Sequence, residues 1–309
     1  MSLSLNNYAV TSYYIYTYID EPIEFRKKHF VFCQQLNLFG RVIVSHEGIN
    51  GTLSGLCLNI YTYISQMKKD KRFSHVDFKV DLTYEHVFPR LSVKVRDEIV
   101  TSKLFYDVKI SRNLSSYLEP KMFNQFLKRD DIFLLDVRNN YEYELGHFAK
   151  AINPGIEHFR DLPQWLEKNL YLMKNKKILT YCTGGVRCEK IVLFLKDKGC
   201  KEVFQLEGGL IKYSQDEDVQ GDLFEGKMYV FDKRISVPVN KKQHIIVGKD
   251  FFDQQPCERY INCANPKCNK QILCSESNEC KYLGSCSVEC RKEPKNIYLI
   301  RSKSNTILE

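Results

Sequence analysis

One short segment in the second half of the chain constrains the fold most. An apolar run at residues 178–181 predicts a buried strand. A glycine-containing turn follows, and apolar side chains at helical spacing then predict a helix that ends near Gly199. A strand joined directly to a helix by a tight turn is typical of a parallel α/β sheet. Ligand sites in such sheets lie at the carboxyl ends of the strands, which is where Cys182 falls.

The turn surrounds Cys182 with groups that stabilise a negative charge on sulfur. Amide N–H groups and the helix dipole converge on it, and Arg187 adds a permanent positive charge. We therefore expect a reactive thiolate on a solvent-facing turn. The alternative is an inert buried cysteine, which is the common role of a free thiol. The predicted active-site loop comprises Thr183, Gly184, Gly185, Val186 and Arg187.

Length and composition indicate a soluble protein of two or three domains. The chain has 309 residues, of which 43% are hydrophobic and 27% charged. No apolar stretch approaches the length of a membrane span, and residues 1–7 lack a signal-sequence pattern. We therefore expect a cytoplasmic protein with no membrane partner. Its 12 cysteines then act as metal ligands or reactive thiols rather than disulfides.

The net charge of +8 comes from the two ends of the chain. Residues 1–132 hold 18 Lys and Arg against 14 Asp and Glu, residues 133–220 hold 13 of each, and residues 221–309 hold 15 against 11. A neutral segment between two basic ones suits a polyanionic substrate that is held from outside. Lysines that serve only solubility would give the same totals.

The first third of the chain has the pattern of a ferredoxin-like βαββαβ domain, which we place at residues 1–92. Between its second and third strands, His46 and Glu47 fit a polar β-turn better than a metal site, because no further ligand follows at a fixed spacing. The six elements are expected at residues 8–18, 22–36, 41–45, 51–55, 60–67 and 76–80.

A connector at residues 93–125 leads to an α/β domain at residues 126–216. The connector holds a predicted strand near residues 93–100 and a polar stretch at residues 111–116. The α/β domain alternates buried strands with helices, which predicts a doubly wound parallel sheet. Its strands are expected at residues 133–137, 178–181 and 202–206.

The last segment, residues 217–309, combines a predicted hairpin at residues 228–239 with seven cysteines in 34 residues. Cysteine pairs on a turn and at a helix start suit a tetrahedral thiolate site, so we expect structural zinc. Disulfides and an iron–sulfur cluster are less favoured alternatives. The predicted ligands are Cys263, Cys268, Cys286 and Cys290. Three others complete this site or form a second: Cys257, Cys274 and Cys280.

Several strings in the chain resemble known sequences. Residues 136–138, 146–147, 151–154 and 206–209, together with the Cys182 loop, resemble a rhodanese domain. Longer strings resemble the rhodanese-containing tRNA uridine hydroxylase (TrhO, UPF0176) family, in the same order over nearly the whole chain. These are HEGINGTLSG at residues 46–55, YCTGGVRCEK at residues 181–190 and FDxR at residues 231–234, where x is any residue.

This resemblance implies an enzyme that adds a hydroxyl group to C5 of the wobble uridine, position 34 of tRNA, with molecular oxygen as co-substrate. It also implies that Cys182 is the persulfide-forming, active-site cysteine and that the anticodon arm is bound. Cys188 is then a candidate resolving thiol, although a core position on the helix fits it equally well. The sequence has no iron-ligand spacing and no flavin or haem motif.

Three functions compete. The first is wobble-uridine hydroxylation, in which a zinc-held, lysine-rich segment clamps the tRNA. The second is a sulfurtransferase that carries persulfide on Cys182. The third is a non-catalytic RNA-binding adaptor, which the intact loop from Cys182 to Arg187 argues against. That loop is one residue shorter than in the rhodanese-like phosphatases, so we exclude a phosphatase. The length of the resemblance favours the hydroxylase.

Overall fold

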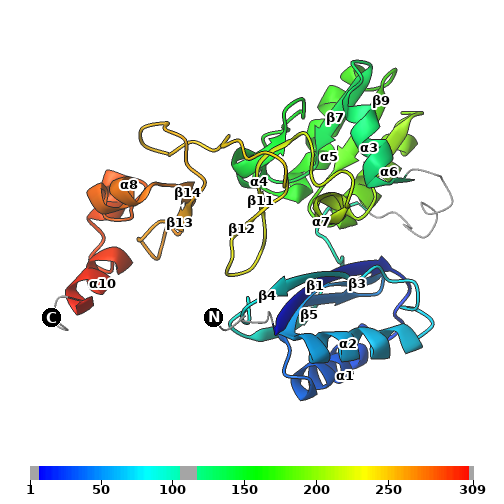
Figure 1. Ribbon diagram of the computed structural model, residues 1–309, viewed down its shortest axis with the longest axis horizontal. Helices are drawn as coiled ribbons and strands as arrows, with labels where there is room; N and C mark the ends of the chain where they lie inside the picture. Colours follow the sequence, from blue (N-terminus) through cyan, green and yellow to red (C-terminus); the bar gives the residue numbers. More distant parts are fainter. Residues whose placement is uncertain (1–6, 105–116, 306–309) are drawn as a thin grey trace.

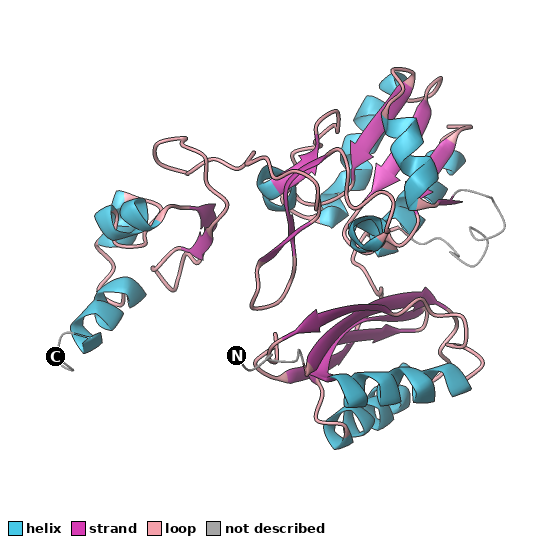
Figure 2. Ribbon diagram, in the orientation of Figure 1, coloured by secondary structure: helices cyan, strands magenta, loops and turns pink. Residues whose placement is uncertain are grey.

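A computed structural model describes residues 7–104 and 117–305 of the chain, with only the backbone described at residues 302–305 (Figure 1). The polar stretch predicted at residues 111–116 lies outside the described residues, as do residues 1–6. Three parts follow one another: an N-terminal sheet with two helices, a central parallel sheet, and a C-terminal segment made mostly of loops (Figure 2). Within the described residues, no helix is both long and apolar enough to cross a membrane.

The N-terminal part confirms the predicted βαββαβ order. Its five-stranded sheet has the order β4-β1-β3-β2-β5, and α1 and α2 cover one face while the other faces the central domain (Figure 1). Side chains alternate along the first strand: Tyr13 and Ile15 pack into the core of this domain, and Tyr14 and Tyr16 lie on the opposite face. The elements are β1 (Tyr8–Tyr16), α1 (Pro22–Gln35), β2 (Phe39–Ser45), β3 (Gly48–Leu56), α2 (Cys57–Lys69), β4 (Lys79–Thr83) and β5 (Leu91–Val95).

Both predicted ends of the connector belong to the adjoining domains. The boundary at residue 92 falls inside β5, which extends the N-terminal sheet because Val93 pairs in parallel with Val42. Residues 98–100 follow as a loop and not as part of a strand. The boundary at residue 125 falls inside α3 (Pro120–Leu127), whose Phe123 is buried in the central core.

The central part confirms the predicted parallel sheet, with strand order β6-β10-β9-β7. Neighbouring residues of a strand point to opposite faces, so Leu179 packs in one core and Ile178 in the other. Two buried faces make the sheet doubly wound. The elements are β6 (Tyr117–Leu118), β7 (Ile132–Asp136), α4 (Asn140–Leu145), α5 (Leu162–Asn169), β9 (Lys177–Tyr181), α6 (Val186–Asp197), β10 (Val203–Leu206) and α7 (Gly209–Gln215), with 3₁₀ turns at Phe159–Asp161 and Leu170–Leu172.

The C-terminal part begins with the predicted hairpin, formed by antiparallel β11 and β12. Strand β11 also pairs with β8, which attaches the hairpin to the central domain. At the hairpin tip, the Lys233 N–H donates to the Val87 carbonyl at 2.9 Å, so this tip contacts the N-terminal domain as well. The elements are β8 (Gly146–Phe148), β11 (Phe224–Tyr229), β12 (Ser236–Pro238), β13 (Tyr260–Asn262), β14 (Gln271–Leu273), α8 (Glu276–Lys281), α9 (Val288–Arg291) and α10 (Ile297–Asn305).

Candidate active site

Cys182 lies in the turn that connects the end of β9 to the start of α6. Gly185, the residue before the helix, has φ of +103° and donates its N–H to the Cys182 sulfur at 3.1 Å. A side chain at Gly185 would also meet the Tyr14 hydroxyl at 2.8 Å. The left-handed backbone and the close approach together require glycine at this position. The loop therefore has the predicted form, with a backbone donor pointing at sulfur.

The surroundings of Cys182 favour the thiolate. Burial opposes ionisation, but a hydrogen bond from Cys188, the charge of Arg187 and backbone donors outweigh it and lower the pKa of Cys182 to about 6. The sulfur is completely buried, so the expected solvent-facing turn was wrong. Cys188 is also buried in the core, where burial and the neighbouring Cys182 raise its pKa. It thus occupies the core position and contacts Cys182 at the same time.

Arg187 is held in place by Glu142, a residue that the sequence interpretation did not select. Two hydrogen bonds of 2.6 and 2.8 Å join the guanidinium to the carboxylate, and both groups are buried. Thr183 donates its hydroxyl to the same carboxylate at 3.1 Å. Burial raises the pKa of Glu142, but Arg187 outweighs this effect and the net pKa is lowered. The capping-box spacing from Asn139 to Glu142 was the available signal.

The residues after Arg187 join the central domain to the N-terminal sheet. Glu189 accepts a hydrogen bond of 2.9 Å from the Tyr14 hydroxyl. The fully buried Lys190 forms ion pairs with Glu47 at 2.9 Å and Glu98 at 2.6 Å. Residues 45–48 form the tight turn that was predicted, but the ion pair of Glu47 with Lys190 was not expected.

A cavity of about 520 Å³ lies between the N-terminal sheet and the Cys182 loop. This volume is within the range that binds a small-molecule ligand. Phe231, at the tip of the C-terminal hairpin, contributes to the wall, so all three parts of the chain meet here. The lining side chains include Ser12, Tyr14, Arg41, Thr52, Lys79, Arg160, Cys182, Arg187 and Phe231.

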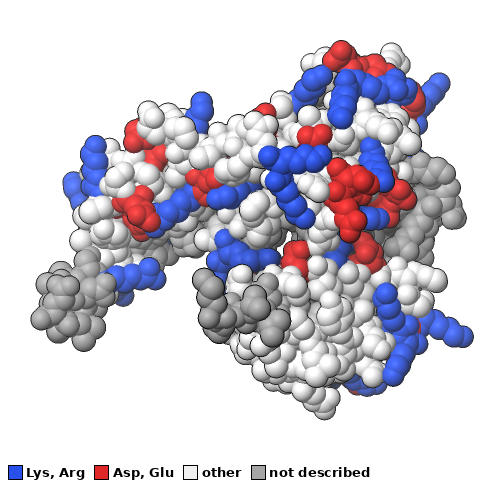
Figure 3. All heavy atoms as spheres, in the orientation of Figure 1, with Lys and Arg blue, Asp and Glu red and all other residues white. Residues whose placement is uncertain are grey.

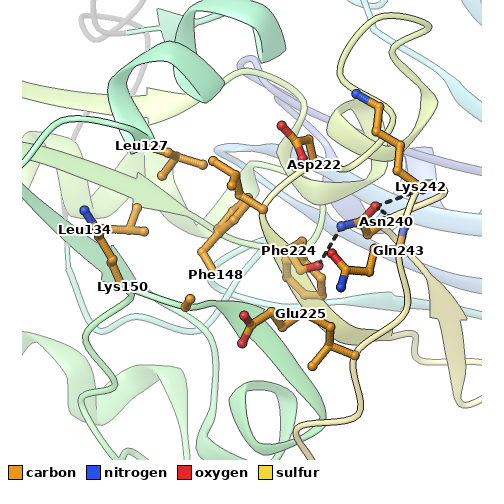
Figure 4. A pocket seen from close by; sticks show the side chains of 13 residues that line it. Leu127, Leu134, Phe148, Lys150, Asp222, Phe224, Glu225, Asn240, Lys242 and Gln243 are labelled. Carbon is orange, nitrogen blue, oxygen red and sulfur yellow. Dashed lines mark hydrogen bonds between the residues drawn. The ribbon is translucent and has the colours of Figure 1, made fainter.

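The cavity is lined by positive charge. Among its described lining residues, four are Lys or Arg and none is Asp or Glu. A second cavity of about 250 Å³ has a balanced lining, with Lys150 and Lys242 against Asp222 and Glu225 (Figure 4), and Cys182 is not among its lining residues. On the face shown in Figure 3, Lys and Arg are spread over all three parts and form no single patch. The lining of the Cys182 cavity therefore favours an anionic ligand.

Four of the seven clustered cysteines come together. The sulfur atoms of Cys263, Cys268, Cys286 and Cys290 all lie within 4.8 Å of one another, with Cys268–Cys286 at 3.6 Å and Cys286–Cys290 at 3.9 Å. Ligands around a tetrahedral zinc, with Zn–S of about 2.3 Å, stand about 3.8 Å apart. The arrangement fits such a metal, and all four cysteines are free thiols.

The other three cysteines are not part of this cluster. Cys257 packs in a small apolar core with Tyr260 and Leu273, and its thiol donates to the Arg259 carbonyl. Cys274 is buried, and Cys280 is exposed on α8. Among the described residues, no second group of metal ligands includes them.

Comparison with known proteins places this architecture in a family. Family models match along the chain: a UPF0176 acylphosphatase-like domain at residues 8–99, a rhodanese-like domain at residues 119–216 and a rhodanase C-terminal region at residues 225–291. The chain is thus a rhodanese-domain protein of the UPF0176 class.

Curated relatives define the family more narrowly. The tRNA uridine(34) hydroxylase of Onion yellows phytoplasma is 55% identical over 96% of each chain, and that of Aster yellows witches'-broom phytoplasma is 54% identical over 98% of each. The enzyme of the same name from Bacillus licheniformis is 51% identical over 95% of this chain and 91% of its own. The chain belongs to the tRNA uridine(34) hydroxylase family, which confirms the resemblance.

Proposed function

We propose that this protein hydroxylates C5 of uridine 34 in tRNA and that Cys182 supplies the reactive sulfur. One observation carries the assignment of the site. A sulfur whose pKa is lowered to about 6 lines a cavity that has cations but, among its described lining residues, no carboxylate. Such a lining suits a nucleotide with its phosphate. The names of the relatives favour hydroxylation over the sulfurtransferase alternative.

The reaction replaces a C5–H bond by C5–O–H. With dioxygen as the oxidant, one oxygen atom enters the base and the other leaves as water, which takes up two further electrons and two protons from a reductant. The residues of the chain bind the nucleotide, orient it and keep the sulfur ionised. Arg187 stabilises the thiolate, and Glu142 fixes Arg187.

We further propose that the Cys263 cluster holds a structural zinc ion. Four thiolates at nearly tetrahedral separations match its preferred donor set. The metal would hold residues 257–301 together, a segment with only short strands and helices. Lys267, Lys270, Lys281, Arg291 and Lys292 in the same segment would contact the anticodon arm. Action on tRNA also fits the predicted cytoplasmic location.

Nucleoside analysis of tRNA tests this function. Cells that lack the gene and have no redundant pathway should lose 5-hydroxyuridine, as read by mass spectrometry. The wild-type gene should restore it, and a Cys182→Ser gene should not. Cys200→Ser is the matched control, because Cys200 is another buried thiol of the same core and lies outside the cavity. Unchanged 5-hydroxyuridine in the deletion strain would contradict the proposed reaction.

A further inference from the structure

The tip of the C-terminal hairpin places an exposed aromatic ring at the Cys182 cavity. Phe231 is 46% exposed although its side chain is large and apolar. It lines the Cys182 cavity and also a smaller adjoining cavity that Arg41 shares. Phe231 begins the string of residues 231–234, in which the backbone of Lys233 contacts the N-terminal domain through Val87.

The hairpin holds this ring in a fixed position. The Val230 N–H donates to the Ile235 carbonyl at 2.8 Å and closes the tip. The Arg234 side chain forms two hydrogen bonds to Asp232, at 2.9 and 2.6 Å, which brace the turn. The Phe231 ring meets Tyr229 edge to face, with centroids 5.1 Å apart. An edge contact leaves a face of the ring open to a ligand.

An exposed cation lines the same two cavities. Arg41 projects from β2 and lines both cavities. Among the described residues no carboxylate forms an ion pair with Arg41, whereas Arg187 is paired with Glu142 and Lys79 with Asp77. The guanidinium of Arg41 is thus available to an external anion.

We propose that Phe231 stacks on a nucleobase of the tRNA at the mouth of the cavity and that Arg41 contacts the adjoining phosphate. This inference rests on the proposed function, for which it names the residues that position the substrate. Single-stranded RNA loops are read by splayed bases that stack on aromatic side chains, and every base offers a face for stacking. Arginine suits a phosphate because its planar fork donates two parallel hydrogen bonds.

A binding experiment tests the stacking separately from the reaction. We expect Phe231→Ala to weaken binding of unmodified tRNA about tenfold or more, and Phe231→Trp to retain it. Arg41→Gln should lower the salt dependence of log Kd by about one unit of slope. Tyr171→Ala and Arg90→Gln serve as controls, because both side chains are exposed and neither lines a cavity described above. Thermal melting of each variant shows that it is folded.

The base in contact with Phe231 can be identified with abasic tRNAs. An abasic site at uridine 34 or at one of its neighbours should remove the penalty of Phe231→Ala, because the base it stacks on is then missing. A folded Phe231→Ala variant that binds tRNA like the wild type would overturn the proposal, as would a penalty that persists in all three abasic tRNAs. Hydroxylation at saturating tRNA is measured in parallel. Absence of product from the wild type, with the binding penalty intact, would reject the reaction and keep the stacking contact.

Discussion

Cys182 and the cysteine cluster of the C-terminal segment differ in what compensates the charge of sulfur. One sulfur at Cys182 is surrounded by the Gly185 N–H, the Cys188 thiol and the Arg187 guanidinium. At the cluster, four sulfurs lie within 4.8 Å of one another, and only isolated donors reach them, such as Asn265 to Cys290 at 3.4 Å. Four thiolates so close together repel each other unless a cation lies between them.

This difference separates a reactive site from a structural one. At Cys182 the protein itself supplies the positive partner, so the sulfur is ionised and still has lone pairs for reaction. At the cluster each sulfur would donate a lone pair to a shared metal. The free energy of metal binding would then contribute to the stability of the folded segment. At Cys182, a change of pH or loss of the sulfur should therefore alter activity. At the cluster, loss of one sulfur should alter the stability of the segment.

The largest expected effect is on activity at Cys182. Replacement Cys182→Ser should lower the hydroxylation rate at least a thousandfold, because a serine hydroxyl stays protonated where the thiol ionises. The fold should persist, since the hydroxyl can accept the Gly185 hydrogen bond in place of sulfur. Single-turnover product formation and thermal melting measure the two effects. Full activity in the folded variant would show that Cys182 is not a reactive site, in contrast to the role proposed for it.

Loss of a ligand at the cluster should have the largest effect on stability. Cys263→Ala should cost several kcal/mol, because a structural zinc site contributes on the order of 10 kcal/mol to the folding of its segment. Limited proteolysis should then cut within residues 257–301 and leave the parallel sheet intact. Zinc content of the reduced protein is measured alongside. Cys280→Ala is the control, since this thiol is exposed and outside the cluster. Equal zinc content in both variants would contradict the assignment.

The pH dependence of Cys182 should follow its lowered pKa. The folded-state pKa is about 6, against an ordinary value of 9.0. The ionised thiol therefore contributes its full share of the unfolding free energy above about pH 9. This contribution is lost as the pH falls through 6. The difference in unfolding free energy between the wild type and Cys182→Ser should rise from pH 6 to pH 9. The thiolate absorbance of the wild type, after subtraction of the absorbance of Cys182→Ser, should titrate with a midpoint near pH 6. A midpoint near pH 9 would show that the loop does not stabilise the thiolate.

The elements that the sequence predicted well depend on local patterns. The apolar run before Cys182 and the glycine before α6 fix a strand, a turn and a helix within about twenty residues, and the structure has all three. Contacts between distant residues escaped prediction. Lys190 and Glu47 each look like a surface charge in sequence, and their ion pair exists only because two domains dock. The two-residue strand β6 was too short to give a pattern.

The same limit applies to the cysteines. Spacing gave four predicted ligands and left three other cysteines open, and the three-dimensional path of the chain brings the four together without the three. The position of Phe231 at the Cys182 cavity was also not predictable, because it requires the hairpin tip to reach the N-terminal domain through Lys233 and Val87. Thus the sequence predicted the local chemistry of both cysteine sites. It did not predict the contacts that residues near Cys182 make with other domains.

Removal of the buried charge at Lys190 tests how much the ion pairs between the domains contribute to stability. Lys190→Met leaves Glu47 and Glu98 without their shared cation, which should cost about 3 kcal/mol of unfolding free energy. Lys198→Met, at the residue that follows the same helix, is the matched control, because its ion pair with Glu167 is exposed and should contribute less than about 1 kcal/mol. Denaturant unfolding of both variants makes the comparison. Equal losses would indicate that the interdomain ion pair does not stabilise the docked arrangement.

The smallest expected effect concerns how the cluster is positioned. The Ser287 side chain accepts the Cys290 N–H at 3.2 Å and caps α9, and Ser275 caps α8 in the same way through Asn278 at 3.3 Å. Either serine replaced by alanine should cost about 1 kcal/mol of stability. Only Ser287→Ala should also weaken metal binding, because only its cap orients a proposed ligand. Competition with a chelator measures this affinity. An equal loss of affinity in Ser275→Ala would mean that the cap stabilises the segment as a whole and does not orient Cys290.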